Sequence, residues 1–311
     1  MKPFLTYDQQ VAKLRSKGLS VPNEDAAKAT LADIGYFSLV NGYKRPLRDP
    51  STRRYKPGAS FEDVVALYEF DRSLRELFLH NLTWVERKLK SAASYAFCDR
   101  HGAAQAAYLD KLNYSPLPKH RSGIDTLVNR IMEPLARRNV DHEYLVHYRG
   151  AHGEVPLWVL TCALTFGQVS KMYSFMAPAD RAVTAKQFEG LNERELGQFV
   201  RFLVFYRNVC AHGELLFCHR EHSDIPDTPL HAKLSIRQVK GAYSSGKRDL
   251  FAVVIALRYL LPAEEFRTFK GQLASLIDRF VRNNDAVEEG ELLSLMGFPG
   301  NWKKVSTYRK R

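Results

Sequence analysis

Apolar residues recur at every third or fourth position along most of the chain, which is the spacing of amphipathic helices. The longest such pattern opens at Ser60, with Asp63 three residues later, and continues to Cys98 before Gly102. Strand-like alternation is scarce, and no alternating strand–helix–strand pattern occurs. We therefore expect an all-α bundle with at most one small hairpin. Further helices are expected near residues 7–17, 23–34 (or on to 40), 123–139, 141–149, 156–176, 179–187, 193–212, 249–261, 262–282 and 288–295.

Capping residues and breakers sharpen these boundaries. Thr6 with Gln9 is typical of a capping box, and Asn23 and Asn192 are placed to cap the second helix and the helix that ends at Gly213. The segments between helices are rich in Pro, Gly and polar residues. We expect an exposed basic loop or hairpin over 48–60, a linker over 110–123, a loop over 214–235 and a mobile basic tail over 301–311.

Composition adds charge to this picture. The 311 residues carry 46 Lys and Arg against 34 Asp and Glu, a net charge of +12 and a pI near 9.5. Such an excess favours phosphate-rich partners, although it also suits a protein that is merely well solvated. The apolar runs are too short to span a membrane, the N-terminus lacks the apolar stretch of a signal peptide, and the four cysteines show no paired spacing. We expect a cytoplasmic protein without a membrane contact.

One short segment carries candidate chemistry, Arg207-Asn208-Val209-Cys210-Ala211-His212 at the end of an apolar helix. A ribonuclease without a metal needs a cation for the scissile phosphate and a group that titrates near neutrality. Arg207 and His212 suit these catalytic roles. Asn208 lies four residues before His212 on the same helix face and could orient the imidazole. The alternative is a surface arginine and a histidine that only favours the helix dipole.

The segment resembles the R-N-x-x-x-H signature of the HEPN superfamily of helical ribonucleases. Three further segments resemble the Abi-like (abortive infection) proteins of that superfamily, in matching order from about residue 3 to residue 220. They are Tyr36-Phe37-Ser38-Leu39-Val40-Asn41-Gly42-Tyr43-Lys44-Arg45, Phe70-Asp71-Arg72-Ser73-Leu74-Arg75, and Pro156-Leu157-Trp158 with Leu164-Thr165-Phe166-Gly167-Gln168-Val169-Ser170.

The resemblance implies a HEPN-like bundle, which we expect over 61–235, after N-terminal helices and the basic loop over 1–60. The C-terminal third carries no motif of the family, and its apolar pattern predicts a helical extension with a basic tail over 236–311. We expect all three parts to form one compact unit. It also implies metal-independent cleavage of single-stranded RNA to cyclic phosphate ends, a homodimer that pairs two motif helices, a toxin against phage, and control by a small RNA. Cys162 stands where family members often have an acid, which puts full activity in question. Glu86 is a candidate acidic helper, or else an ordinary partner of Lys90.

A second constellation is basic. Lys44, Arg45, Arg53 and Arg54 cluster with aromatic residues, and with Tyr43 and Asn41 they form a candidate RNA-binding surface, because cations hold phosphates and aromatic faces stack on bases. The alternative is a solvated loop whose aromatic residues belong to the core.

No cofactor or metal is expected. His142 and His147 are one residue too far apart for a zinc-protease helix, and the cysteines and histidines of 210–222 lack a close Cys pair. Besides the ribonuclease, two readings stay open: a helical RNA-binding protein that does not cut, and a protein-interaction or antitoxin partner. The basic surplus argues against the last of these.

Overall fold

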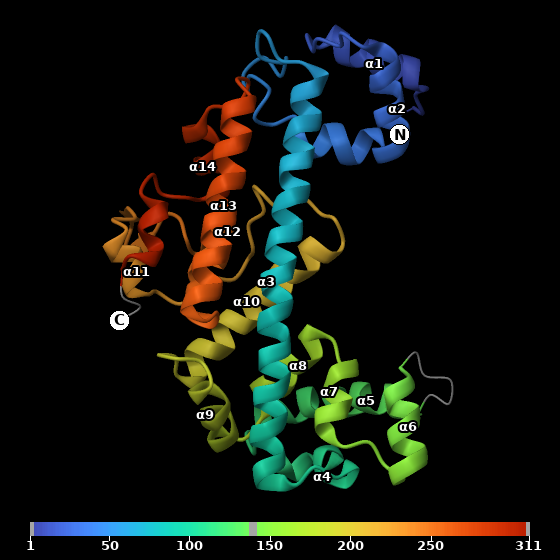
Figure 1. The fold of residues 1–311 in the computed structure, drawn as a ribbon, viewed down its shortest axis with the longest axis vertical. Coiled ribbons are helices and arrows are strands. Elements are labelled where there is room, and N and C mark those ends of the chain that lie inside the picture. Colours follow the sequence, from blue (N-terminus) through green and yellow to red (C-terminus); the bar gives the residue numbers. More distant parts are fainter. Residues whose placement is uncertain (1–2, 137–141, 309–311) are drawn as a thin grey trace.

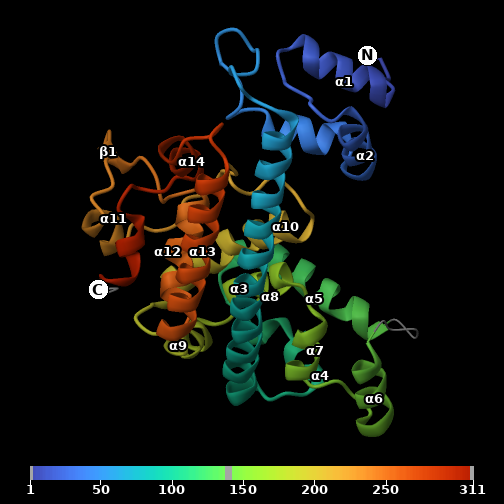
Figure 2. The same ribbon diagram turned by 45° about the horizontal axis from the view of Figure 1, so that its top comes forward.

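The computed structural model describes residues 3–136 and 142–308, and it confirms the all-α class. One long helix, α3 (Phe61–His101), runs along the long axis of the molecule, and the other helices gather around it (Figures 1 and 2). Ser60 and Asp63 form the predicted capping box, and the helix ends at Gly102, whose φ of 84° suits glycine. The pattern of apolar positions therefore placed the central element correctly.

The N-terminal helices α1 (Tyr7–Ser16) and α2 (Glu24–Ile34) lie at one end of α3, beyond a π-helical turn η1 (Phe37–Asn41). Thr6 with Gln9, and Asn23, form the predicted caps. The short helix α4 (Gln105–Leu109) and two 3₁₀ turns, η2 (Lys111–Asn113) and η3 (Pro118–His120), lie at the other end. The segment predicted as a linker thus contains short helical turns.

Helices α5 (Arg121–Ala136) and α6 (Glu143–His152) follow, and the parts of their predicted spans that fall on 137–141 lie outside the described residues. The single helix predicted over 156–176 is wrong, because it is two helices, α7 (Leu157–Ala163) and α8 (Phe166–Phe175). The break lies at Thr165, whose backbone is extended and whose side chain forms a capping box with Gln168.

Helices α9 (Pro178–Lys186) and α10 (Glu193–Ala211) pack on α3, and Asn192 caps α10 as predicted. The segment after α10 contains α11 (Pro229–Lys233), where only a loop was expected. A two-stranded antiparallel hairpin joins β1 (Gln238–Val239) to β2 (Ala242–Tyr243). The basic loop over 48–60 forms two isolated bridges, one between Arg48 and Tyr55 within it and one from Ser60 to Ser20.

The C-terminal helices are α12 (Leu250–Leu260), α13 (Ala263–Asn283) and α14 (Glu289–Met296). Helix α13 packs along α3, where the Phe70 and Phe280 rings are 4.6 Å apart. The prediction of a mobile tail is wrong for its described part, because the 3₁₀ turn η4 (Trp302–Ser306) packs on α12 and α13. Trp302 is fully buried there. Apolar contacts therefore fix a segment that we expected to be mobile because it is basic.

Candidate functional site

Arg207 lies near the end of α10 and faces the central helix. Its Nε is 3.4 Å from Oε2 of Glu86 on α3, and Oε1 of Glu86 is 2.9 Å from Nζ of Lys90. Both interactions are largely shielded, since the Glu86 side chain is 8% exposed and that of Arg207 is 29% exposed. The carboxylate of Glu86 thus lies close to two cations. It forms an ion pair with Lys90, as one reading of the sequence predicted, and it also lies close to Arg207.

His212 lies one residue beyond α10, as its C-terminal cap. The imidazole is exposed, and the helix end beside it favours a positive charge. The backbone N–H of His212 donates to the carbonyl of Asn208 over 2.9 Å. Among the described residues, no hydrogen bond links the side chain of His212 to that of Asn208 or Arg207. One chain therefore presents His212 to solvent and turns Arg207 inward.

The outward face of α10 carries a stripe that leads to His212. Arg201, Phe205, Asn208 and His212 follow one another at three- or four-residue intervals, so they share a face, and all four are exposed. Phe205 is 45% exposed, which is unusual for a phenylalanine in the middle of a packed helix. This face is the part of α10 that can meet a second macromolecule.

A buried carboxylate fixes the chain just after His212. Asp71 on α3 accepts hydrogen bonds from the backbone N–H groups of Leu216 (3.1 Å) and Phe217 (2.6 Å). It also accepts from the hydroxyl of Tyr43 (2.7 Å) and from the guanidinium of Arg75 (2.5 Å). Burial raises the pKa of Asp71, and these donors oppose the rise. Asp71 therefore ties the segment that follows His212 to the central helix.

The same contacts explain how three of the sequence motifs meet. Tyr43 comes from the segment 36–45, Asp71 and Arg75 come from the segment 70–75, and the backbone that they hold follows the segment 207–212. Arg75 also donates to the carbonyl of Glu214 over 3.4 Å. The sequence motifs alone suggested no role for Asp71 or Arg75. The signal that could have indicated one is an aspartate and an arginine four residues apart on an apolar helix.

The structure corrects the role suggested for Tyr43. Its ring is only 3% exposed, and it packs against Tyr68 and Phe217 while its hydroxyl binds Asp71. A nucleotide base cannot reach either face of a ring buried in this way. Tyr43 is therefore a positioning residue in the core and not an RNA-stacking residue.

The other candidate RNA-binding residues lie at the surface near α1. Arg45, Arg53 and Arg54 are exposed, and Arg53 has a positive φ of 58° at the tip of the loop. Asn41 and Lys44 are half-buried and bond to each other through their side chains. The loop therefore offers three exposed arginines beside a half-buried pair.

The segment around Trp158 and Cys162 is also at the surface. Trp158 is 51% exposed, and Sγ of Cys162 lies 3.5 Å from its carbonyl oxygen. Cys162 is itself exposed, so an acid at this position would have reached solvent. Helix α8 begins just after it and packs on α10, where Gly167 faces Val204.

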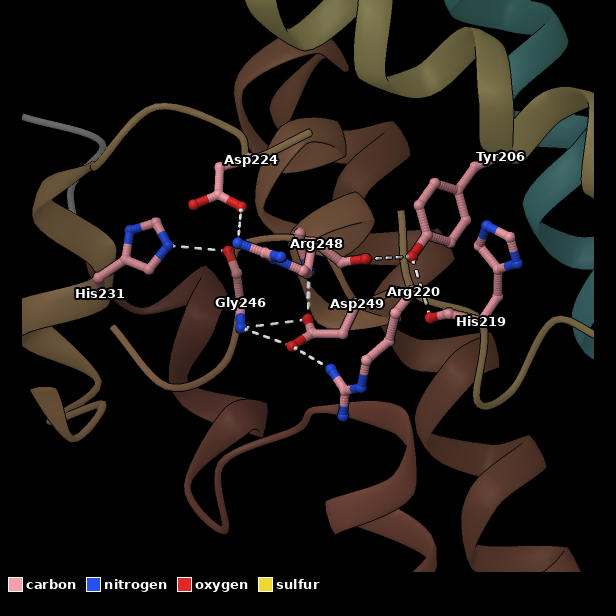
Figure 3. A network of polar contacts seen from close by, with 9 residues as sticks. Tyr206, His219, Arg220, Asp224, His231, Gly246, Arg248 and Asp249 are labelled. Carbon is pink, nitrogen blue, oxygen red and sulfur yellow. Dashed lines mark hydrogen bonds and ion pairs between the residues drawn. The ribbon is translucent and has the colours of Figure 1, made fainter. Parts of the chain in front are cut away.

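A polar network that was not predicted from the sequence connects Tyr206 on α10 to the segment 219–249 (Figure 3). Asp249 caps α12, accepts from the backbone N–H of Gly246 and pairs with Arg220 at 3.0 Å. The hydroxyl of Tyr206 on α10 donates to the carbonyls of His219 and Arg248. The network links α10 to the C-terminal helices.

A neighbouring histidine, His231 on α11, belongs to the core. Nε2 of His231 lies 2.8 Å from the carbonyl oxygen of Gly246, and its ring stacks on Tyr243 at 4.8 Å. Burial lowers the pKa of His231, so the ring is neutral at pH 7. His231 is thus a structural residue rather than a second acid–base group.

Metal-ligand geometry is absent from the described residues, in which no three His, Cys, Asp or Glu side chains group closely enough to hold an ion. Burial raises the pKa of Cys210 to about 12, so its thiol stays protonated at neutral pH.

None of the helices in the described ranges is both long enough and apolar enough to cross a membrane.

Comparisons with known proteins give one match. No curated protein and no solved structure matches the chain. The family described as Abi-like protein matches residues 29–218, which is more than half of the 311 residues. The match begins within α2, leaves α1 outside, includes all four motif segments and ends in the segment that Asp71 holds. The chain therefore belongs to the Abi-like protein family.

Proposed function

We propose that this protein is a metal-independent endoribonuclease of the HEPN type that acts as an abortive-infection toxin against phage. One observation carries the proposal: His212 is exposed at the end of α10, on a segment that Asp71 clamps to the central helix. A solvated imidazole on a fixed backbone is suited to move a proton at a bound RNA. Membership of the Abi-like family supports the biological role.

The chemistry requires two proton transfers. The 2′-hydroxyl of a ribose attacks the adjacent phosphorus and loses its proton, and the 5′-oxygen of the next nucleotide gains one as it leaves. The products are a 2′,3′-cyclic phosphate and a 5′-hydroxyl. His212 performs one of these transfers, and the guanidinium of Arg207 balances charge on the phosphate while Glu86 positions it.

A second copy of the chain would supply the other transfer. The outward stripe of α10, with Phe205 exposed about two helical turns before His212, is suited to pack against the same stripe of a second copy. Two copies of His212 would then flank one RNA strand. We therefore propose a homodimer, with RNA as substrate and a small RNA as regulator.

Purified protein incubated with total RNA in EDTA should cleave it and leave 2′,3′-cyclic phosphate ends. The reason is that no step above uses a metal ion. The ends are identified by ligation that requires a cyclic phosphate, with and without prior phosphatase treatment. Cleavage that chelation abolishes and magnesium restores would contradict the mechanism. RNA binding without cleavage in either buffer would favour the non-cleaving RNA-binding protein instead.

RNA binding by the exposed arginines of the loop has its own test. Reversing Arg45, Arg53 and Arg54 to glutamate should flatten the log–log salt dependence of RNA affinity by about two to three units, because each phosphate contact releases counterions. The loss should be nearly independent of RNA sequence, since phosphate contacts carry no base information. Filter binding across a salt series measures both quantities.

A matched control separates local contact from net charge. Reversal of three exposed cations at the opposite end of α3, Lys119, Arg121 and Arg130, changes the net charge equally. It should leave the slope near that of the natural protein. Equal slopes for the two triple variants would show that the loop is an ordinary solvated surface and makes no specific contact with RNA.

A further inference from the structure

A hollow of about 300 Å³ opens between the start of α1 and the turn η1. It lies at the N-terminal end of the molecule (Figure 1), and most of it is built by residues outside the family match. Its lining comes from three separate stretches of sequence: Pro3, Phe4, Leu5, Gln10, Lys13 and Lys17, then Tyr36, Phe37 and Asn41, then Lys44 and Arg48.

The hollow is strongly basic. Four of its lining side chains are cations, and none of the described residues that line it is acidic. The ammonium of Lys13 lies 5.8 Å above the ring of Tyr36, and the guanidinium of Arg48 lies 4.4 Å above that of Tyr55. Cations gathered around a concave surface raise its positive potential and attract a compact anion such as a phosphate.

Two aromatic rings stand at the edge of this basic hollow. Phe4 is 88% exposed and Phe37 is 79% exposed, although Leu39 and Val40, which follow Phe37 closely, are buried. Large apolar side chains left in water next to a cavity are a feature of ligand sites. A flat aromatic or heterocyclic ring could cover them and bury their faces.

Two side chains that line the hollow each carry a buried polar atom without a partner. Oε1 of Gln10 and Nε of Arg48 are buried and have no hydrogen-bond partner within the described part of the chain. The amide of Gln10 is already held on its other side, because Nε2 donates to the carbonyl of Leu5 over 2.9 Å. The wall of the hollow is thus polar as well as basic, which suits a polar ligand better than an apolar one.

We propose that this hollow binds a phosphate-bearing nucleotide. The cations hold the phosphate, and Phe4 or Phe37 stacks on the base. The nucleotide is either a free nucleoside phosphate or the 5′-phosphorylated end of an RNA, since the two share this chemistry. The site is distinct from the His212 site, and its existence does not depend on cleavage there.

Isothermal titration of the full chain distinguishes the two sources. The probes are ATP and a ten-nucleotide 2′-O-methyl RNA with a 5′-phosphate or a 5′-hydroxyl, because this backbone cannot be cleaved through its 2′-oxygen. ATP binding identifies a free nucleotide, and a preference for the 5′-phosphorylated oligomer without ATP binding identifies an RNA end. Binding of neither, or competition by inorganic pyrophosphate as strong as that by ATP, overturns the proposal.

Two variants connect the binding to the hollow. Lys13→Gln and Phe37→Ala should each weaken the affinity by roughly tenfold, the effect of losing one charge-assisted contact or one stacking contact. Matched controls are Lys119→Gln, an exposed cation outside the hollow and outside the loop, and Tyr95→Ala, an aromatic residue 64% exposed on α3. All four side chains lie at or near the surface, so thermal unfolding should stay unchanged. Affinity that survives both test variants overturns the assignment.

Discussion

The His212→Ala variant should lose RNA cleavage by about 10²–10⁴-fold, the usual contribution of a general acid or base, and should keep its stability. The imidazole is exposed and makes no side-chain hydrogen bond within the described chain, so its removal leaves no buried group without a partner. Initial rates of RNA cleavage and thermal unfolding are measured on the same preparation. Expression of the natural protein should slow growth, and expression of the variant should not.

The Arg207→Ala variant should also lose cleavage, but with a different effect on stability. Glu86 is 8% exposed and would keep Lys90 as its only ion-pair partner within the described chain. A buried carboxylate that loses a partner destabilises the folded state. Arg207→Lys keeps the charge without the planar fork and should recover stability better than activity.

The matched control is His222→Ala, which removes another exposed histidine ten residues further along the chain. It should change neither cleavage nor growth. A folded His212→Ala variant that cleaves RNA as fast as the natural protein would remove His212 from the mechanism. The RNA contacts of the protein would then have to serve binding alone.

Local sequence signals predicted the helix boundaries well. The caps at Thr6, Asn23, Ser60 and Asn192 each act within three residues, so the sequence alone contains all the interacting groups. The break before α8 was predictable for the same reason, since Thr165 and Gln168 have capping-box spacing. It was missed because the apolar pattern continues across the break.

Long-range contacts were beyond the sequence. The packing of Trp302 and the polar network at Asp249 join segments that have no pattern in common. For Tyr43, an aromatic residue among cations predicted a surface role, whereas a buried hydrogen bond to Asp71 decides its position. In each case the position of the residue depends on a partner in another element. That partner is too far away along the chain for the local sequence pattern to reveal the contact.

Asp71 makes the contact on which the site most depends, and its loss should be the most costly single change to the fold. Asp71→Ala should lower the free energy of unfolding by about 3–5 kcal/mol, the cost of removing one partner from a buried ion pair. The guanidinium of Arg75, which is 8% exposed, would lose its carboxylate partner, and the N–H groups of Leu216 and Phe217 would lose their acceptor. Urea unfolding followed by circular dichroism measures this free energy.

The milder Asp71→Asn variant tests how Asp71 acts on His212. It keeps the size of the side chain but cannot neutralise Arg75, so it should fold with reduced stability. Hydrogen exchange at Leu216 and Phe217 should rise, and RNA cleavage should fall with His212 itself intact, because the backbone after α10 is no longer held. The control is Arg72→Ala, next to Asp71, which should affect neither quantity: Arg72 is exposed and pairs with Glu69 and Glu76 of the same helix. Full cleavage by a folded Asp71→Asn variant with loosened Leu216 and Phe217 would show that the clamp stabilises the protein without positioning His212.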